Sequence, residues 1–408
     1  MQDQNKNRQM AYLSICSFAI LFVGMGLFPL LPIYAGLLGA STIIIGIFLA
    51  LTSVSLAVGT LLTNTMVSRF SRKGTFIAMG IAGALVLFAL GFANELWQVI
   101  LLTSLVWFTG GVGTALVNVY IGLRAGEQDR GKWFSLISLT LPVAAILGGL
   151  VVGKLVELWG YPLMFFLIAA EYALWPVIGL WKIEEVQAPK AQKITQVNAN
   201  NARSGTGFQF LLLATLLAAI PVSVNRLGLS LVMEENLFSP SAITGTNVVG
   251  GLITIPVVLW FGALSDRLGR RFFLILGYLI AATGSLFLIF ASQLWHFWFI
   301  TISMLVSRSV TGSLSSALAS DLLPPQALDR SLPRLSSMSW IAGVLGFAGS
   351  GYMMETFGRG TLFLILTFLP LAASLLLGLL PGKQSELAPA VSARAELDYK
   401  RCAADAMC

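Results

Sequence analysis

Twelve long apolar segments, separated by short polar stretches, constrain the fold of this chain more than any other feature of the sequence. A helix needs about 20 mainly apolar residues to cross a bilayer, and each segment is roughly that long. The segments are continuously apolar rather than alternating, which favours helices over a membrane barrel. The sequence therefore predicts an all-α membrane protein with transmembrane helices at residues 10–35, 41–65, 74–93, 97–122, 133–155, 162–181, 208–232, 241–264, 272–292, 296–320, 335–355 and 360–380.

The low content of charged residues supports a membrane location. Only 11% of the residues are charged and 57% are hydrophobic, whereas soluble domains carry about 25% charged residues. The net charge of +7 comes from positive residues in the short loops. This distribution indicates membrane topology rather than a nucleic-acid-binding surface, and no nucleic-acid partner is expected.

The orientation in the membrane follows from the positions of lysine and arginine. If the N-terminus is cytoplasmic, 21 of the 25 positive residues fall on the cytoplasmic side. Lys154 and Arg359 fall on the outer side, and Arg226 and Arg308 lie within apolar segments. Cytoplasmic loops are enriched in positive residues. We therefore expect a multi-pass protein of the cell membrane with both termini in the cytoplasm.

The chain divides into two similar halves. A shift of 198 residues aligns Phe92, Trp97 and Glu157 with Phe290, Trp295 and Glu355. Such a parallel repeat is typical of transporters and predicts two pseudo-symmetric six-helix bundles. The expected divisions are residues 1–185 for the first bundle, 186–207 for a cytoplasmic linker, 208–382 for the second bundle, and 383–408 for a disordered tail.

Two loop sequences and the repeat resemble the major facilitator superfamily. Residues 262–271 read GALSDRLGRR, and residues 64–73 form a degraded copy, NTMVSRFSRK. Within that superfamily, Pro29 and Pro32 resemble the first helix of the drug/proton antiporter branch. Two features depart from that branch: residues 105–111 lack its usual fourth-helix arginine, and Ala144-Ala145 replace its usual Gly-Pro. The resemblance implies the major facilitator fold and transport by alternating access.

The loop at 262–271 is a candidate conformational latch. A carboxylate at a helix junction can accept backbone N–H bonds, and glycine permits a tight turn. The resemblance implies that the loop joins the halves and stabilises the outward-facing state, and the alternative is a simple topology anchor. We expect Asp266 near Arg130 or Lys132. The latch residues are Gly262, Asp266, Arg267, Gly269, Arg270 and Arg271.

Two arginines within apolar segments are the main candidates for substrate binding. An arginine inside the membrane costs about 3 kcal/mol on insertion scales unless it is paired or faces water. The resemblance implies that the first, fourth, seventh and tenth helices line a central cavity. Alternatively, Arg308 is a structural hydrogen-bonding residue and Arg226 reaches the outer surface. The candidate substrate-binding residues are Arg308, Arg226, Asn225, Asn118, Tyr120 and Tyr34.

Glu171 is the only acidic residue deep within an apolar segment. Burial favours the uncharged form of a carboxyl group, which suits a proton carrier. Glu171 is therefore the candidate for proton coupling, and local pairing within the sixth helix is the alternative. Glu157 and Glu355 occupy matched positions at the outer ends of the fifth and eleventh helices, where we expect surface or gate-rim positions.

Enzymatic functions are disfavoured. The sequence has no GxxxxGK[ST] phosphate-binding loop and only one histidine, which argues against an ATP-driven pump, a hydrolase and a metalloenzyme. We expect no cofactor and no metal. The expected function is proton-coupled efflux of a small, partly apolar compound. The alternatives are uptake or uniport of an anionic metabolite, and a non-transporting sensor or scaffold. The expected partners are the substrate, protons and membrane lipids, and the expected state is a monomer.

Overall fold

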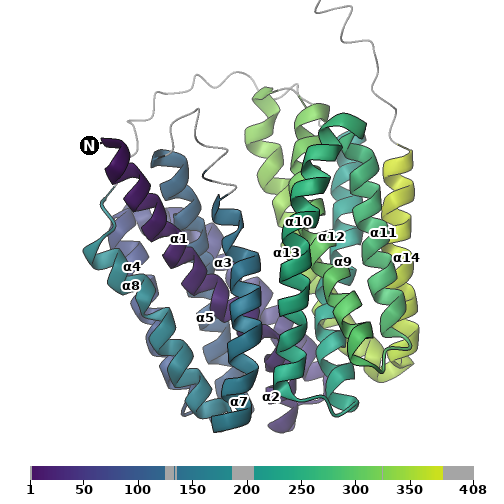
Figure 1. The fold of residues 1–408 in the computed structure, drawn as a ribbon, viewed down its shortest axis with the longest axis horizontal. Coiled ribbons are helices and arrows are strands. Elements are labelled where there is room, and N and C mark those ends of the chain that lie inside the picture. The colour runs from purple at the N-terminus through teal and green to yellow at the C-terminus, as the bar shows by residue number, and fades with distance from the viewer. Residues whose placement is uncertain (1, 125–132, 134–135, 186–205, 324, 380–408) are drawn as a thin grey trace, which may run out of the picture.

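A computed structural model of the chain describes residues 2–124, 133, 136–185, 206–323 and 325–379. Every regular element in these ranges is helical (Figure 1). The first half contains α1 (Gln2–Leu27), the 3-10 turn η1 (Phe28–Leu30), α2 (Leu31–Leu37), α3 (Thr42–Arg69), α4 (Arg72–Leu90), α5 (Leu96–Arg124), α7 (Thr140–Tyr172) and α8 (Leu174–Trp181). The second half contains α9 (Thr206–Glu235), α10 (Pro240–Leu268), α11 (Arg270–Leu288), α12 (Leu294–Leu322), α13 (Pro325–Phe357) and α14 (Arg359–Gly378).

The described residues contain ten segments that are long and apolar enough to cross a membrane. One of them, Leu136–Trp181, has two limbs, because the backbone at Gly160 is non-helical. The long helix α13 is not among the ten, although it packs within the bundle against α3 and α9. The predicted count of twelve is reached only by separating the limbs and adding α13, so that count stays a prediction.

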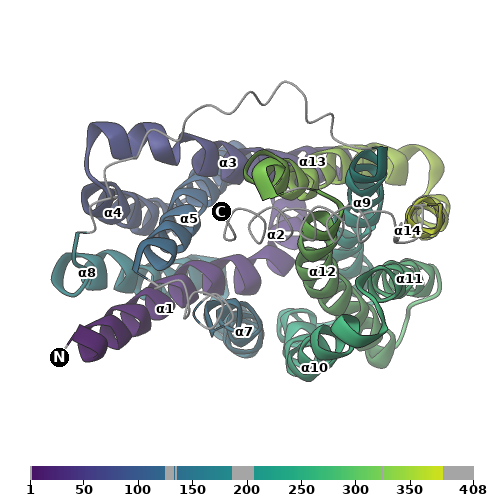
Figure 2. The same ribbon diagram turned by 90° about the horizontal axis from the view of Figure 1, so that it is seen from above.

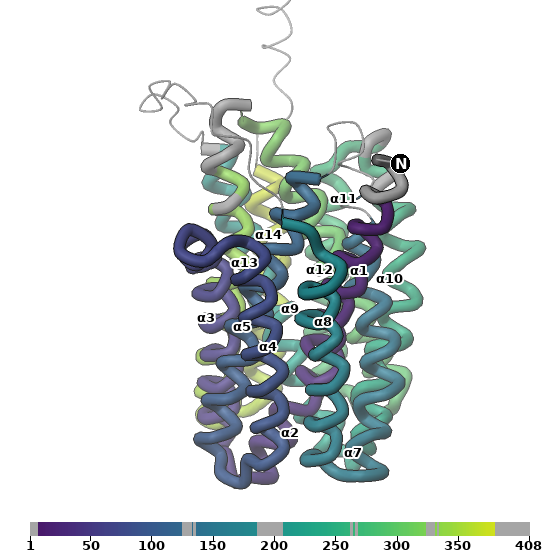
Figure 3. Tube along the Cα trace, turned by 90° about the vertical axis from the view of Figure 1, so that its left-hand side faces the viewer, coloured from purple at the N-terminus to yellow at the C-terminus, as the bar shows by residue number. Residues whose placement is uncertain are grey.

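The two halves form two helical bundles that meet along two helix pairs. One pair joins α7 to α10, and the other joins α3 to α13. Between these pairs, α1 and α5 of the first half lie opposite α9 and α12 of the second half (Figure 2). Viewed from the side of the first half, the helices run along a common direction, with the N-terminus at one end (Figure 3). We call the opposite end of the bundle, where α2 lies, the far end.

The repeat is visible in the backbone as well as in the sequence. Gly160 and Gly358 are 198 positions apart and have φ angles of 76° and 78°, a conformation that glycine adopts without steric cost. Ser41 and Ser239 are separated by the same 198 positions, and their side chains cap the N-termini of α3 and α10. The described residues thus form two bundles with the same local structure at matched positions, as the sequence predicts.

Candidate functional site

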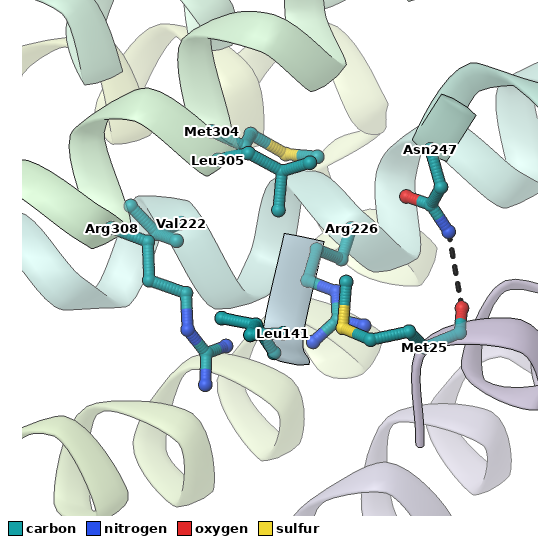
Figure 4. A pocket seen from close by; sticks show the side chains of 8 residues that line it. All are labelled: Met25, Leu141, Val222, Arg226, Asn247, Met304, Leu305 and Arg308. Carbon is teal, nitrogen blue, oxygen red and sulfur yellow. Dashed lines mark hydrogen bonds between the residues drawn. The ribbon is translucent and has the colours of Figure 1, made fainter. Parts of the chain in front are cut away.

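A narrow pocket lies where α1 and α7 of the first half meet α9, α10 and α12 of the second half (Figure 4). Its free space is about 10 Å³, which is room for about one water molecule. A larger ligand therefore requires the side chains or the two halves to move. Apolar side chains and two arginines share the wall, which consists of Met25, Leu141, Val222, Arg226, Asn247, Met304, Leu305 and Arg308.

Arg226 reaches the pocket from the middle of α9 and contacts the first half through an aromatic ring. Its guanidinium carbon lies 4.0 Å from the centroid of the Phe28 ring. Phe28 begins the 3-10 turn at which Pro29 interrupts the first membrane helix. A cation over an aromatic face is stabilised by about 0.5–2 kcal/mol. The turn at Pro29 thus presents the aromatic ring of Phe28 to a cation of the opposite half.

Arg308 reaches the same pocket from the middle of α12. Its side chain is exposed, and Figure 4 shows its guanidinium group extending away from α12. Within the described part of the chain, no hydrogen bond or ion pair joins it to a carboxylate. No acidic residue is among the described residues that line the pocket. The pocket therefore carries two positive charges without a compensating negative charge in its wall.

Asn247 was not predicted, and it joins the two halves at the pocket. Pro29 has no N–H, so the carbonyl of Met25, four residues earlier, lacks its usual helical donor. The side-chain amide of Asn247 on α10 donates to that carbonyl at 3.1 Å (Figure 4). Pro29 could have indicated from the sequence that the Met25 carbonyl needs a donor. The sequence gives no sign that the donor comes from the other half.

Asn225 does not line the pocket, although its neighbour Arg226 does. It is fully buried, and its amide donates to the hydroxyl of Ser285 on α11 at 2.9 Å. Consecutive residues on a helix point about 100° apart. Asn225 therefore faces the interior of its own bundle when Arg226 faces the other half.

The other three predicted binding residues also lie outside the wall of this pocket. Tyr34 donates to the Ala93 carbonyl at 3.2 Å and stacks on Tyr161. Tyr120 is buried within the first bundle, and its ring makes a T-shaped contact with the Phe76 ring. Both tyrosines therefore pack inside the first half, whereas Asn118 is exposed on α5.

Exposed polar side chains on α5 match small residues at the corresponding positions of α12. On α5, Thr114 and Asn118 are exposed, one helical turn apart. The positions 198 residues later on α12 are Gly312, which is exposed, and Ser316, which is half-buried. Polar side chains are costly against lipid, and the two helices lie on opposite sides of the middle of the molecule (Figure 2). These faces suit a water-filled approach to the pocket better than a lipid-facing surface.

Glu171 lies within the first bundle, away from the pocket. Both of its carboxyl oxygens are buried, and neither has a hydrogen-bond partner in the described part of the chain. An ionised carboxylate in such a site costs far more than a neutral carboxylic acid. The structure thus provides a buried carboxyl group that can hold a proton, at a distance from the arginine-lined pocket.

Two arginines of the 262–271 loop form hydrogen bonds within the second half. Arg270 donates to the Ala317 carbonyl and to the Asp321 carboxylate on α12, both at 3.0 Å. Arg271 donates to the Gly378 carbonyl at the end of α14. Gly269 has a φ of 100° and forms the turn between α10 and α11. These bonds tie the loop to its own bundle.

The predicted contacts of the latch with the first half lie outside the described structure. Gly262 lies within α10, and the side chains of Asp266 and Arg267 are not described. Arg130 and Lys132, the expected partners of Asp266, are also outside the described residues. The role of this loop as a latch between the halves stays a prediction.

The halves are in close contact at the far end. A Cβ atom built on Gly46 of α3 would lie 2.5 Å from the Phe347 carbonyl of α13. At the matched contact, the hydroxyl of Thr244 on α10 donates to the Gly149 carbonyl on α7 at 2.8 Å. Gly46 and Thr244, like Gly149 and Phe347, are 198 positions apart. The halves are therefore closed at the far end by two related interfaces.

Comparison with known proteins identifies the family of this chain. A family model described as Major Facilitator Superfamily matches residues 13–210 and again residues 211–398. The multidrug resistance protein MdtG of Proteus mirabilis (strain HI4320) is 24% identical over 275 residues, which is 63% of this chain and 67% of that protein. The multidrug resistance protein MdtH of Enterobacter sp. (strain 638) is 21% identical over 379 residues, which is 87% of this chain and 88% of that protein.

Solved structures show the same fold. A bacterial homologue of the human lysosomal transporter Spinster, in an inward-facing and occupied conformation, superposes with a TM-score of 0.75 at 14% identity. The superposition covers 91% of this chain and 95% of that structure. With two successive family matches and this fold, the chain belongs to the Major Facilitator Superfamily and is a multi-pass membrane transporter rather than an enzyme.

Proposed function

We propose that this transporter exports a small, partly apolar compound in exchange for protons, by alternating access. The pocket between the halves carries the proposal, because side chains from both halves form its wall. A rocking motion of the halves would change both the size of this pocket and the side on which it opens. The multidrug resistance proteins MdtG and MdtH are relatives of this chain, which favours export and a partly apolar substrate.

The far-end contacts support one specific conformation. The distribution of positive residues favours a cytoplasmic N-terminus, so we take the far end as the outer side in this proposal. Closure at the far end, together with the exposed polar side chains on α5, then corresponds to an inward-facing state. Export requires these contacts to separate after the substrate has entered from the cytoplasm.

Glu171 supplies the candidate proton site. Its buried carboxyl oxygens have no hydrogen-bond partner among the described residues, so the group can hold a proton within the membrane. Because Glu171 lies apart from the pocket, proton binding would act through the packing of the first bundle rather than by direct contact with the substrate. The proposed coupling is therefore conformational.

A second candidate function is a carrier for an anionic metabolite that does not use protons. Arg226 and Arg308 favour it, since two positive charges with no acidic residue among the described lining residues attract anions. Flux through such a carrier would follow the gradient of the metabolite and would not depend on Glu171. The two candidates therefore predict different responses to a pH gradient.

Inside-out vesicles from cells that express the chain test both candidates. A panel of small apolar acids, amides and amines is offered with an acidic lumen and again with the gradient collapsed by an ionophore. Proton-coupled export predicts gradient-dependent accumulation, which Glu171→Gln abolishes while exchange at equal pH continues. Glu95→Gln is the control, because Glu95 is exposed in the loop before α5. Accumulation that ignores the gradient would contradict antiport and leave the anion carrier.

A further inference from the structure

We propose that the substrate is an amphipathic organic anion, whose acidic group binds between Arg226 and Arg308 and whose apolar part contacts Met25, Leu141 and Met304. This inference rests on the proposed transport function and names the substrate class of the same pocket. It follows from three observations: the excess of positive charge in the wall, the available guanidinium donors of the two arginines, and the apolar side chains around them.

The first observation is an excess of positive charge. Arg226 and Arg308 line one pocket, and no acidic residue is among its described lining residues. Two like charges that line one pocket repel each other. A bound anion offsets this repulsion, because it pairs with both guanidinium groups. An organic cation, in contrast, would be repelled by the same wall.

The second observation is that the guanidinium donors are available. Each guanidinium carries five N–H donors and no acceptor. Arg226 lies 4.0 Å from the Phe28 ring, and an aromatic face supplies no strong hydrogen-bond acceptor. Arg308 has no hydrogen bond or ion pair to another described side chain and is exposed. The planar fork of an arginine suits two-point binding of a carboxylate, sulfonate or phosphate.

The third observation is the apolar remainder of the wall. Met25 and Leu141 come from the first half and Met304 from the second, so the substrate body would contact both bundles. Methionine side chains are flexible and polarisable, and they adapt to ligands of different shape. A small inorganic anion would leave these side chains without a partner. The wall therefore fits an acid that carries an apolar body.

The donors in the wall separate this class from neutral polar ligands. One N–H of the Asn247 amide donates to the Met25 carbonyl, which leaves a single neutral donor on that side chain. The other strong donors of the described wall are the two charged guanidinium groups. A neutral amide of the same shape would lose the charge-assisted part of the interaction, which is about twice as strong as a neutral hydrogen bond.

Matched pairs of an acid and its amide test the inference on the purified full-length protein. Binding of 1-naphthoate and 1-naphthamide, and of octanoate and octanamide, is measured by isothermal titration. The expected result is that each acid binds roughly tenfold to a hundredfold more tightly than its amide. Arg226→Gln and Arg308→Gln should each remove most of that preference, and Arg308→Lys should keep part of it.

The control is Arg69→Gln, which removes an exposed arginine at the end of α3 and should leave the preference unchanged. Thermal unfolding of each variant identifies any variant that fails to fold. If Arg308→Gln does not fold, Arg308→Lys still tests the role of this side chain. Three results would each overturn the inference. The amides could bind as tightly as the acids, the preference for acids could survive both arginine replacements, or the acids could fail to bind.

Flux measurements separate this inference from the proposed function. If proteoliposomes transport the amides but not the acids, the substrate class is wrong while transport stands. If the acids bind through both arginines but no member of either pair crosses the membrane, the anion site stands and the transport proposal fails. Transport of the acids that Arg226→Gln and Arg308→Gln both abolish supports the two together.

Discussion

The carboxylate of Glu157 accepts a hydrogen bond from the backbone N–H of Ser241 at 2.9 Å, and this bond joins the two halves at the far end. Glu355 accepts a bond from the backbone N–H of Ile43 at 3.2 Å in the same manner. Glu157 and Glu355 are 198 positions apart, and so are Ile43 and Ser241. Each half thus contributes one carboxylate and one helix N-terminus to a pseudo-symmetric pair of bonds.

The physical basis of this pair is the N-terminus of a helix. Ile43 and Ser241 lie in the first turns of α3 and α10, where backbone N–H groups have no partner within the helix. A negative charge there is also favoured by the helix dipole. Each bond exists only while the far end is closed, so the pair stabilises one conformation of the transporter relative to the other.

The first prediction concerns these carboxylates. Glu157→Gln and Glu355→Gln should each weaken far-end closure by about 1 kcal/mol, because an exposed charge-assisted bond becomes a neutral one. Spin labels on both halves at the far end should show roughly a fivefold increase in the open-to-closed ratio for each variant, and more for the double variant. Glu95→Gln is the matched control. Distance distributions that do not change in the double variant would rule out this role.

The second prediction concerns the glycines at the far-end interface. A Cβ atom on Gly46 would lie 2.5 Å from the Phe347 carbonyl, and one on Gly153 would lie 2.5 Å from the Pro240 carbonyl. Gly46→Ala and Gly153→Ala should therefore separate the halves at a cost of roughly 1–3 kcal/mol. The measurement is the reactivity of a far-end cysteine with an impermeant thiol reagent, which should increase.

Gly245→Ala is the control for this experiment. Gly245 lies on α10 beside Thr244, and a Cβ atom there would have no neighbour within 4 Å. Its replacement should leave the cysteine reactivity at the wild-type level. Equal reactivity in Gly46→Ala, Gly153→Ala and Gly245→Ala would show that close packing of the halves does not control access.

The third prediction concerns the bond between Asn247 and the Met25 carbonyl. Asn247→Leu should leave this carbonyl unpaired and lower the thermal stability of the protein by about 1–3 kcal/mol. Pro29→Ala restores an N–H that can pair with the same carbonyl within the helix. The loss caused by Asn247→Leu should therefore be smaller in the Pro29→Ala background. Additive effects of the two replacements on the unfolding midpoint would disprove the link.

The fourth prediction separates Asn225 from its neighbour Arg226. Asn225→Ala removes a fully buried amide that donates to Ser285, so it should lower thermal stability by about 1–3 kcal/mol. Ligand affinity of the folded variant should stay within twofold of the wild type, whereas Arg226→Gln should reduce affinity for acids. Parallel titration and unfolding experiments measure both effects. A large loss of affinity in Asn225→Ala would place Asn225 in the binding site.

The sequence predicted the fold well, because membrane helices need long apolar segments and the repeat aligns at one offset. The apolar segments gave the approximate helix positions, and the matched glutamates indicated related places in the two halves. The sequence could not reveal that Glu157 and Glu355 each bond the helix N-terminus of the opposite half. That relationship depends on how the bundles pack, which no local pattern records.

Which candidate binding residues line the pocket was harder to predict, for geometric reasons. Arg226 and Arg308 line the pocket, and a charge inside the membrane needs a polar or solvated environment, but their role in binding stays a prediction. Tyr34 and Tyr120 have apolar rings that pack equally well in a helix interface, and both lie inside the first bundle. Asn247 was not predicted, because its role depends on the Met25 carbonyl of α1, which Pro29 leaves without a helical donor.

The most direct test of alternating access is a reversible cross-link at the far end. Glu157→Cys and Ser241→Cys, in a background without Cys16, Cys402 and Cys408, place two thiols where the halves meet. A short cleavable cross-linker then holds that end closed in proteoliposomes loaded with a transported acid. We predict that cross-linking stops flux and that cleavage of the linker restores it. Flux at the wild-type rate through the cross-linked protein would contradict alternating access around this pocket.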